Sequence, residues 1–272
     1  MAFIKTTFLW VIVFNYYIIK SLYFTTLFLL RIINILITVK VVVFLYKMVT
    51  FDMYSALLDI FTSAVPLVKD VVELPDESCD KLFRTWRSEQ WLYMLLNGCT
   101  RTGFISYSDI TKRALDYTEF KLNYSFTPEQ KERLLHHVWE NFKAWPEAKE
   151  VLEELRARGY TIAMLSNGDR DMLEPLQQST GIQFDHIFAA DMARCHKPGP
   201  EIYALPKMVL GMEPADFLHV CGSANDLMGA SYAGIQCAWH NRRADRPYDP
   251  NIKPVFEVRN LYGLLDYLPP IV

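Results

Sequence analysis

The sequence predicts an α/β fold in which a doubly wound parallel sheet carries an inserted helical domain. From residue 146 onward, short apolar runs that favour strands alternate with patterns that favour helices. One strand-like run stands apart at 48–51, and a long helical block separates it from the others. Strands that alternate with helices are joined by right-handed crossovers into a parallel sheet.

The first predicted strand, Met48–Phe51, ends on Asp52, and a loop of small and polar residues is expected to follow. Ligands of open α/β sheets bind in the crevice at the carboxyl ends of the strands, so Asp52 is a candidate catalytic carboxylate. A helix N-cap is the plainer interpretation of an aspartate in this place. The residues downstream favour the catalytic interpretation.

Residues 66–143 are predicted to form a helical domain inserted into a core made of 48–65 and 144–272. Mainly apolar and aromatic side chains recur at three- and four-residue steps between Leu82 and Leu96, which indicates an amphipathic helix. Thr127 and Pro128 form a start signal for a later helix, because a capping residue is followed by proline at the first turn. Residues 76–124 are predicted to be mostly helical, and a second helix within them is expected at 108–122. A further helix is expected at 128–142.

The second part of the core alternates strand and helix to its end. Its predicted strands cover 160–165, 186–190, 217–220, 236–239 and 256–258. Its predicted helices cover 147–158, 171–180, 203–210 and 227–233.

The first 47 residues are apolar but carry a basic residue about every ten positions. Their longest uncharged run, 6–19, has 14 residues, fewer than the ~20 that a membrane-spanning helix needs. No small-residue cleavage site of a signal peptide follows. Three interpretations stay open: a membrane anchor, an unusual targeting sequence, or a start codon assigned too far upstream. We favour the last, because Met48 stands at the start of the first predicted strand. We expect a cytoplasmic protein that meets a membrane only if 1–47 are retained.

The charge of the chain and the spacing of its cysteines bear on nucleic-acid binding and on the redox state of the thiols. Residues 1–47 hold five basic and no acidic residues, so the rest of the chain has 23 basic and 31 acidic residues, a net charge of -8. No basic stripe of the kind that follows nucleic acid is present, and nucleic-acid binding is excluded. The five cysteines are scattered without a CxxC pair, which is typical of reduced thiols in an intracellular protein.

Polar side chains follow successive strands or stand at helix entrances. They are Asp52, Ser166, Asn167, Lys197 and Asp226. The carboxyl ends of parallel strands share one edge, so these residues are expected to converge on one crevice. Two carboxylates, a lysine, a hydroxyl and an amide suit hydrolysis through a covalent intermediate.

The order of these motifs resembles that of the haloacid dehalogenase-like (HAD) hydrolase superfamily over residues 48 to about 265. Within it, the chain is most similar to the type II L-2-haloacid dehalogenases. The resemblance implies a Rossmann-like core with the helical block as a cap domain. It rests on Phe51-Asp52-Met53-Tyr54, Trp86-Arg87 with Gln90 and Tyr93, Leu165-Ser166-Asn167-Gly168, Lys197-Pro198 with Tyr203, and Gly222 to Asp226.

The resemblance also implies roles for the catalytic residues. Asp52 would attack the halogen-bearing carbon and leave an ester on the enzyme, which water would cleave with help from Asp226. Lys197 would keep Asp52 charged and aimed, since a nearby cation favours an ionised carboxylate.

The remaining site residues are expected to bind the substrate. Ser166, Asn167 and Ser223 would hold it, and Tyr54 and Tyr203 would shape the pocket. Arg87 would receive the halide or the substrate carboxylate, a task that suits a permanently charged guanidinium. Ordinary core packing for the tyrosines and a surface ion pair for Arg87 stay open as alternatives.

The residues that would bind a metal in phosphatase relatives are replaced here. Those relatives carry aspartates where this chain has Tyr54 and Gly222. The remaining carboxylates, Asp52 and Asp226, make a poor site for Mg²⁺, which phosphoryl transfer requires and halide displacement does not. We therefore predict a small carboxylate substrate, no cofactor, and Mg²⁺ only if the protein is a phosphatase; a homodimer is possible.

Several positions depart from the dehalogenase pattern. Ser55-Ala56 replaces Gly-Thr, which is expected to remove a hydroxyl near the nucleophile. Cys221, Ser223 and Asn225 replace serine, asparagine and a pocket tryptophan. A Mg²⁺-dependent phosphatase and a catalytically silent binding protein therefore remain as alternatives to the dehalogenase.

Overall fold

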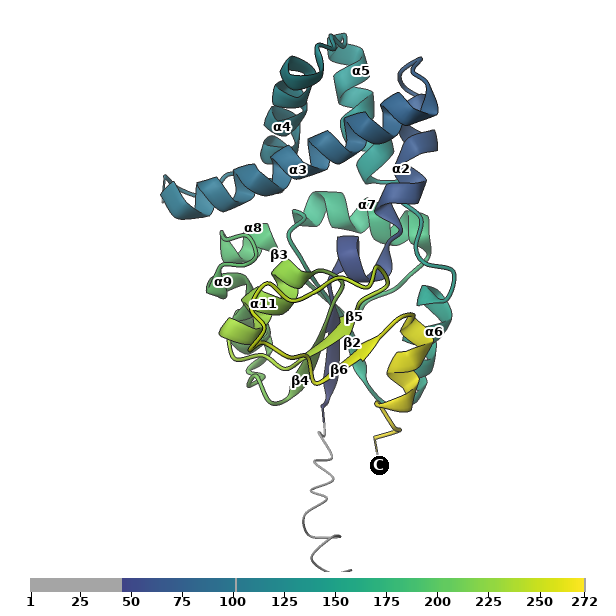
Figure 1. Ribbon diagram of the computed structural model, residues 1–272. Helices are drawn as coiled ribbons and strands as arrows, with labels where there is room; N and C mark the ends of the chain where they lie inside the picture. Colours follow the sequence, from purple (N-terminus) through teal and green to yellow (C-terminus); the bar gives the residue numbers. More distant parts are fainter. Residues whose placement is uncertain (1–45, 101, 272) are drawn as a thin grey trace, which may run out of the picture. The chain divides into compact units, whose positions relative to one another are not determined.

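The computed structural model describes residues 46–100 and 102–271 (Figure 1). Most of the predicted N-terminal extension, residues 1–45, lies outside the described residues. Within the described part of the chain, no helix combines the length and apolar character that crossing a bilayer requires.

Six parallel strands form one sheet in the order β3-β2-β1-β4-β5-β6. β1 is central because it pairs with β2 on one side and β4 on the other, with Phe51 in register with Met164 and Val220. The predicted α/β fold with a doubly wound parallel sheet is confirmed, and each strand limit agrees with the prediction to within one residue. The strands are β1 Met48–Phe51, β2 Thr161–Ser166, β3 His186–Ala189, β4 Phe217–Cys221, β5 Cys237–His240 and β6 Phe256–Val258.

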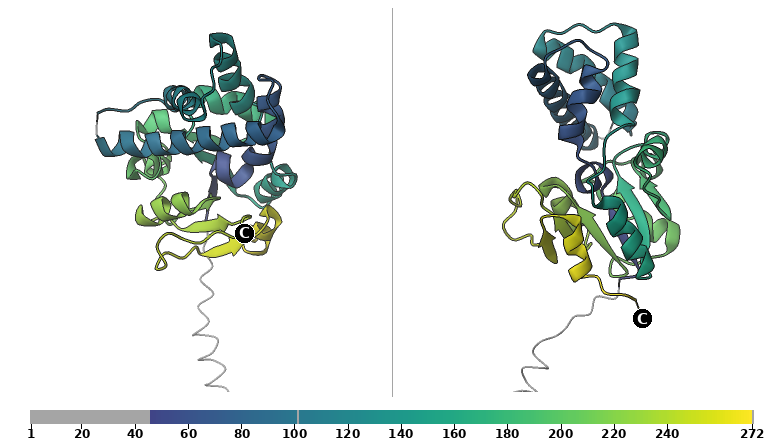
Figure 2. Two further views of the ribbon diagram at one scale, coloured as in Figure 1. Left: turned by 45° about the horizontal axis from the view of Figure 1, so that its top comes forward. Right: turned by 90° about the vertical axis from the view of Figure 1, so that its right-hand side faces the viewer.

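Both faces of the sheet are apolar and covered by helices (Figure 2). Alternate residues of a strand point to opposite faces. Val49 and Phe51 accordingly belong to a different apolar core from Met48. The flanking helices are α6 Ala148–Ala157, α7 Arg170–Thr180, α8 Ala190–Ala193, α9 Pro200–Tyr203, α10 Leu205–Leu210, α11 Ala224–Tyr232 and η3 Leu261–Asp266.

A block of helices lies over the carboxyl edge of the sheet, at the top of Figure 1. The expected capping box is present, since Thr127 Oγ1 accepts from Gln130 N and Gln130 Oε1 accepts from Thr127 N. The block consists of α2 Ile60–Lys69, α3 Asp76–Thr100, α4 Tyr107–Leu122, α5 Pro128–Arg133 and η2 Leu134–Val138.

The chain after Asp52 is helical where a loop was expected. A π-helical turn, η1 Met53–Leu57, follows directly and leads into α2. Pro66 lies inside α2, and the sequence did not predict this helix because proline rarely stands within a helix. The predicted domain boundary between residues 65 and 66 falls within this helix.

Other helix limits also differ from the prediction. The helix from 128 ends at Val138 rather than 142. The expected helix at 203–210 is two short helices, because Pro206 lies in the first turn of the second one and cannot donate a backbone hydrogen bond. α11 begins at Ala224, three residues early, where the Ser223 side chain caps it.

Candidate active site

Asp52 is held by the turn that follows β1. Its Oδ2 accepts from the Ser55 backbone N at 2.6 Å and from Ser55 Oγ at 2.5 Å. The carboxylate therefore caps η1, and it also lines a cavity. The expectation that Ser55-Ala56 removes a hydroxyl near the nucleophile is wrong, because Ser55 supplies one directly to the carboxylate.

Lys197 lies between two carboxylates. Its Nζ donates to Asp52 Oδ1 at 3.1 Å and to Asp226 Oδ2 at 2.9 Å, and the residue is only 3% exposed. Its backbone N donates to Asn167 Oδ1 at 2.6 Å, which fixes the loop that carries it. Burial opposes the ammonium form, but Asp226 and Asp52 raise the pKa of Lys197 above its ordinary value. Lys197 is therefore a buried, charged link between the two predicted catalytic aspartates.

Asp226 stands in the first turn of α11 and is fully engaged by protein donors. Tyr203 Oη donates to Oδ1 at 2.7 Å, while Lys197 Nζ and His219 Nε2 lie 2.9 Å from Oδ2. Burial would raise the pKa of Asp226, but Lys197 and His219 hold it well below its ordinary value of 3.8. Asp226 is consequently ionised and a weak proton acceptor.

His219 is a site residue that sequence reasoning missed. It lies in the middle of β4, fully buried, with Nε2 against Asp226 and Nδ1 2.9 Å from Thr50 Oγ1 on β1. If Nε2 carries the proton, it donates to Asp226 and Nδ1 accepts from Thr50. The only sequence signal was one histidine in an otherwise apolar strand, and such a residue usually belongs to the core.

The cavity beside Asp52 measures about 510 Å³. The sheet edge contributes both aspartates, and α3 contributes arginines from the helical block. The helical block therefore encloses the crevice into which the strands deliver the polar groups. Its lining includes Asp52, Tyr54, Phe61, Arg84, Arg87, Trp91, Asn167, Lys197, Ser223, Asn225, Asp226 and Arg243.

The predicted substrate-binding residues differ in where they lie. Asn167 and Ser223 line the cavity, and Ser223 Oγ also accepts from Asp226 N at 3.3 Å. Ser166 is fully buried and accepts from Gly168 N, and Tyr203 contacts Asp226; neither is part of the cavity lining. Direct substrate contact by Ser166 and Tyr203 stays a prediction.

Arg87 and Tyr54 line the side of the cavity where aromatic rings gather. The Arg87 guanidinium donates to Gln90 and to Tyr107 Oη, and its Cζ lies 6.0 Å from the centre of the Tyr54 ring. Tyr54 stacks on Tyr107 with ring centres 5.5 Å apart. Its buried hydroxyl has no hydrogen-bond partner among the described residues, and burial raises its pKa well above the usual range. Tyr54 therefore offers a protonated, unused donor to a ligand.

The position of Gly222 excludes a third carboxylate. A Cβ atom there would lie 2.0 Å from the Ser55 carbonyl oxygen and 2.5 Å from Ala56 N, far inside contact distance. Lys197 meanwhile occupies the space between the two aspartates with its own positive charge. These donors do not fit Mg²⁺, which requires several oxygen ligands in octahedral geometry.

This arrangement of sheet edge, paired aspartates and helical cover can be compared with known proteins. A family model of haloacid dehalogenase-like hydrolases matches residues 46–234. The chain belongs to this family.

Individual relatives of this haloacid dehalogenase-like hydrolase are similar along most of their length. Haloacetate dehalogenase H-2 from Moraxella sp. (strain B) is 30% identical over 71% of this chain and 85% of the relative. (S)-2-Haloacid dehalogenase 4A from Burkholderia cepacia is 30% identical over 72% of this chain and 84% of the relative. The structure of L-2-haloacid dehalogenase from Xanthobacter autotrophicus with chloropropionic acid covalently bound has a TM-score of 0.74 at 26% identity, covering 80% of this chain and 96% of that chain.

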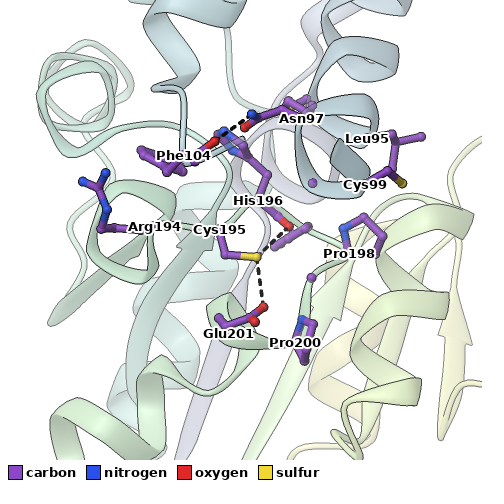
Figure 3. A pocket seen from close by; sticks show the side chains of 15 residues that line it. Leu95, Asn97, Cys99, Phe104, Arg194, Cys195, His196, Pro198, Pro200 and Glu201 are labelled. Carbon is purple, nitrogen blue, oxygen red and sulfur yellow. Dashed lines mark hydrogen bonds between the residues drawn. The ribbon is translucent and has the colours of Figure 1, made fainter. Parts of the chain in front are cut away.

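The hydrolase has a second cavity of about 680 Å³ near the end of α3 (Figure 3). Cys195 Sγ donates there to Glu201 Oε2 at 3.1 Å. Burial, and then Glu201, raise the pKa of Cys195 to about 12. The thiol stays protonated at neutral pH and is a poor nucleophile. Cys195 is therefore not a candidate nucleophile, and Asp52 in the smaller cavity stays the predicted one.

Proposed function

We propose that this chain is a metal-independent hydrolase that displaces halide from short 2-haloacids through an ester on Asp52. The observation that carries the proposal is the position of Lys197, whose ammonium lies between Asp52 and Asp226. A carboxylate nucleophile is thereby charge-balanced by the protein itself. The similarity to a haloacetate dehalogenase and to an (S)-2-haloacid dehalogenase supports the same reaction.

In the first step, Asp52 Oδ1 attacks the halogen-bearing carbon. Oδ1 has one protein donor, at 3.1 Å, whereas the lone pairs of Oδ2 are engaged by two donors at 2.6 and 2.5 Å. The carbon–oxygen bond forms as the carbon–halogen bond breaks, and halide leaves with the bonding electron pair. Arg87, on the aromatic side of the cavity, offers a permanent positive charge to the departing halide or the substrate carboxylate.

In the second step, water adds to the carbonyl carbon of the ester. Oδ2 is then the carbonyl oxygen, and negative charge develops on it as water adds. The Ser55 N–H and Oγ–H already point at this oxygen and would stabilise the charge as an oxyanion hole does. Collapse of the intermediate breaks the bond to the alkoxide oxygen and restores the Asp52 carboxylate. One proton of water goes to the alkoxide, which leaves as the 2-hydroxyacid, and the other is lost to solvent.

Asp226 acts in this scheme through orientation and charge. Its low pKa makes it a weak general base, and three protein donors occupy its oxygens. It fixes Lys197 while Asp52 alternates between a charged carboxylate and a neutral ester. The helical block over the sheet edge acts as a cap that limits water around the reacting carbon.

The substrate carboxylate is bound by groups that have unused hydrogen-bonding capacity. Tyr54 lines the cavity together with Asn167 and Ser223, and its buried hydroxyl has no partner within the described part of the chain. A buried donor without a partner is costly, so a ligand oxygen at this point would be bound favourably.

The direct test is incubation with L-2-chloropropionate while chloride is measured, with Asp52→Asn as the matched control. We expect chloride release by the unmodified protein, a loss of about 10³-fold or more in the variant, and no effect of EDTA. Single turnover in water enriched in heavy oxygen should place the label on the peptide that contains Asp52. Label that enters the product without first entering Asp52 contradicts the ester mechanism, and activity that depends on Mg²⁺ favours a phosphatase.

A further inference from the structure

We propose that Arg84 and Arg243, both placed over the ring of Phe61, form a second anion-binding subsite that selects 2-haloacids with a second carboxylate. The inference rests on the proposed function for its reaction, but the binding subsite can be tested without any reaction. The substrate class is therefore a short 2-halodicarboxylate.

Three segments far apart in the sequence build this subsite. Phe61 is in the first turn of α2, Arg84 is on α3, and Arg243 follows β5. The guanidinium carbons of Arg84 and Arg243 lie 4.8 and 4.1 Å from the centre of the Phe61 ring. All three residues line the Asp52 cavity. The ring therefore gathers two cations at the cavity that holds the nucleophile.

The cavity lining has more positive than negative charge. Its carboxylates are Asp52 and Asp226, and both are bound to Lys197. Arg84, Arg87 and Arg243 supply three further positive charges. One substrate carboxylate at the reacting end balances one of these charges, so the residues that line the cavity keep a net positive charge.

The two subsite arginines differ in their existing partners. Arg84 Nε donates to Asp80 Oδ2 at 2.7 Å in an exposed pair on α3, which balances part of its charge. Arg243 forms no side-chain ion pair within residues 46–100 and 102–271. Asp59 and Asp245 are its acidic neighbours, yet partial desolvation of this otherwise exposed side chain, together with Arg84 and Arg87, lowers the pKa of Arg243. A guanidinium crowded by like charges is one that an added anion stabilises.

The size of the cavity agrees with a substrate longer than a three-carbon acid. Its 510 Å³ lies in the range of pockets that enclose much larger ligands. A guanidinium binds a carboxylate through two parallel N–H donors, so arginines provide direction as well as charge. A second carboxylate beside Phe61 would fix the far end of the substrate while Asp52 attacks the near end.

The kinetic test compares L-2-chlorosuccinate with L-2-chloropropionate. We expect the unmodified protein to prefer chlorosuccinate, and Arg243→Gln to lower the ratio of the two kcat/KM values about tenfold, as loss of a charged hydrogen bond does. Arg246→Gln is the matched control, because Arg246 is exposed in the same loop and does not line the cavity. It should leave the ratio unchanged. An equal ratio in the unmodified protein and Arg243→Gln contradicts the subsite.

A binding measurement separates this inference from the proposed function. Succinate and propionate contain no halogen, and their affinities for the unmodified protein can be compared by calorimetry. Tighter binding of succinate that Arg243→Gln removes supports the subsite, even if no chloride is ever released from a haloacid. If chloropropionate is hydrolysed but succinate binds no more tightly than propionate, the proposed function stands and the subsite is wrong.

Discussion

The charged groups at the two ends of the Asp52 cavity differ in burial and in pairing. At the inner end, formed by Asp52, Lys197, Asp226 and His219, every group is buried and bound to other protein groups. At the outer end, formed by Phe61, Arg84 and Arg243, both arginines are exposed and one of them has no ion-pair partner among the described residues. The inner end is arranged before substrate arrives, whereas the outer end is completed by an anion.

This difference assigns the reaction to the inner end and the choice of substrate to the outer end. Donors fixed in advance around Asp52 need no rearrangement when charge moves in the reaction. Exposed guanidinium groups can adjust to different ligands and are only weakly coupled to the stability of the fold. Substitutions at the inner end should therefore affect stability and rate together, and those at the outer end should affect substrate choice alone.

The largest effect on stability is expected for Lys197→Met. Removing the ammonium leaves Asp52 and Asp226 facing each other without compensation, and breaking a buried pair costs about 3–5 kcal/mol. Urea unfolding measures this change. Lys207→Met is the matched control, because Lys207 forms an exposed pair with Glu213 and should change stability by less than about 1 kcal/mol. Equal losses in the two variants would remove the distinction between the ends.

The next largest effect is expected for Gly222→Ala, which tests how tightly the inner end is packed. The new Cβ would meet backbone atoms of Ser55 and Ala56, which cannot move as a flexible side chain does. We expect a loss of about 3 kcal/mol in the free energy of unfolding, at the upper end of overpacking costs. Gly98→Ala on α3 has open space around it and should stabilise by about 0.5–1 kcal/mol. A neutral Gly222→Ala would show that η1 moves easily.

A smaller effect is expected for His219→Phe. The ring is kept, but Asp226 loses one donor and Thr50 loses its partner. We expect kcat to fall about tenfold, as loss of a hydrogen bond to a charged group does. His219→Gln, which retains a donor, should recover part of the rate. If both variants lose the same rate, the hydrogen bond is not what matters at this position.

Acid stability should also distinguish the inner end. The folded pKa of Asp226 lies below its ordinary value, so its stabilisation is fully present above that value of 3.8 and is lost as pH falls below it. Each proton taken up on unfolding changes stability by about 1.4 kcal/mol per pH unit. Asp226→Asn should flatten this decline between pH 4 and 2, by about that slope, in urea titrations. An unchanged slope would mean that other carboxylates control acid unfolding.

The smallest effect is expected for Arg84→Gln at the outer end. It removes an exposed pair with Asp80 four residues away, and such pairs contribute about 0.5 kcal/mol or less. Unfolding in urea should therefore match that of the unmodified protein closely. A loss comparable with that of Lys197→Met would show that the outer end also supports the fold.

The sequence predicted the sheet edge well because its signals are local. Asp52, Asn167 and Asp226 each follow an apolar strand, and parallel pairing brings such ends together whatever lies between them. Lys197 comes from a loop, but its motif places it beside the same edge. The sequence therefore located the inner end of the cavity, although not the hydrogen bonds within it.

Other features depend on contacts that no local pattern records. His219 stands among apolar residues in the sequence, as a core residue does. The pairing of β1 with β4 brings it to Thr50, and the position of α11 brings Asp226 to it. Phe61 and Arg243 lie in segments to which the sequence assigned no helix or strand, and they meet through the tertiary fold. α2 was missed because Pro66 argues against a helix until its packing against α3 is known.

The close approach of the Ser55 backbone to Gly222 limits which residue position 222 can hold. Any side chain there would collide with the backbone of η1. A carboxylate could therefore be placed at position 222 only if residues 53–57 followed a different path, so exchanging the lysine-based site for a metal-based one requires a change of backbone as well as of side chain.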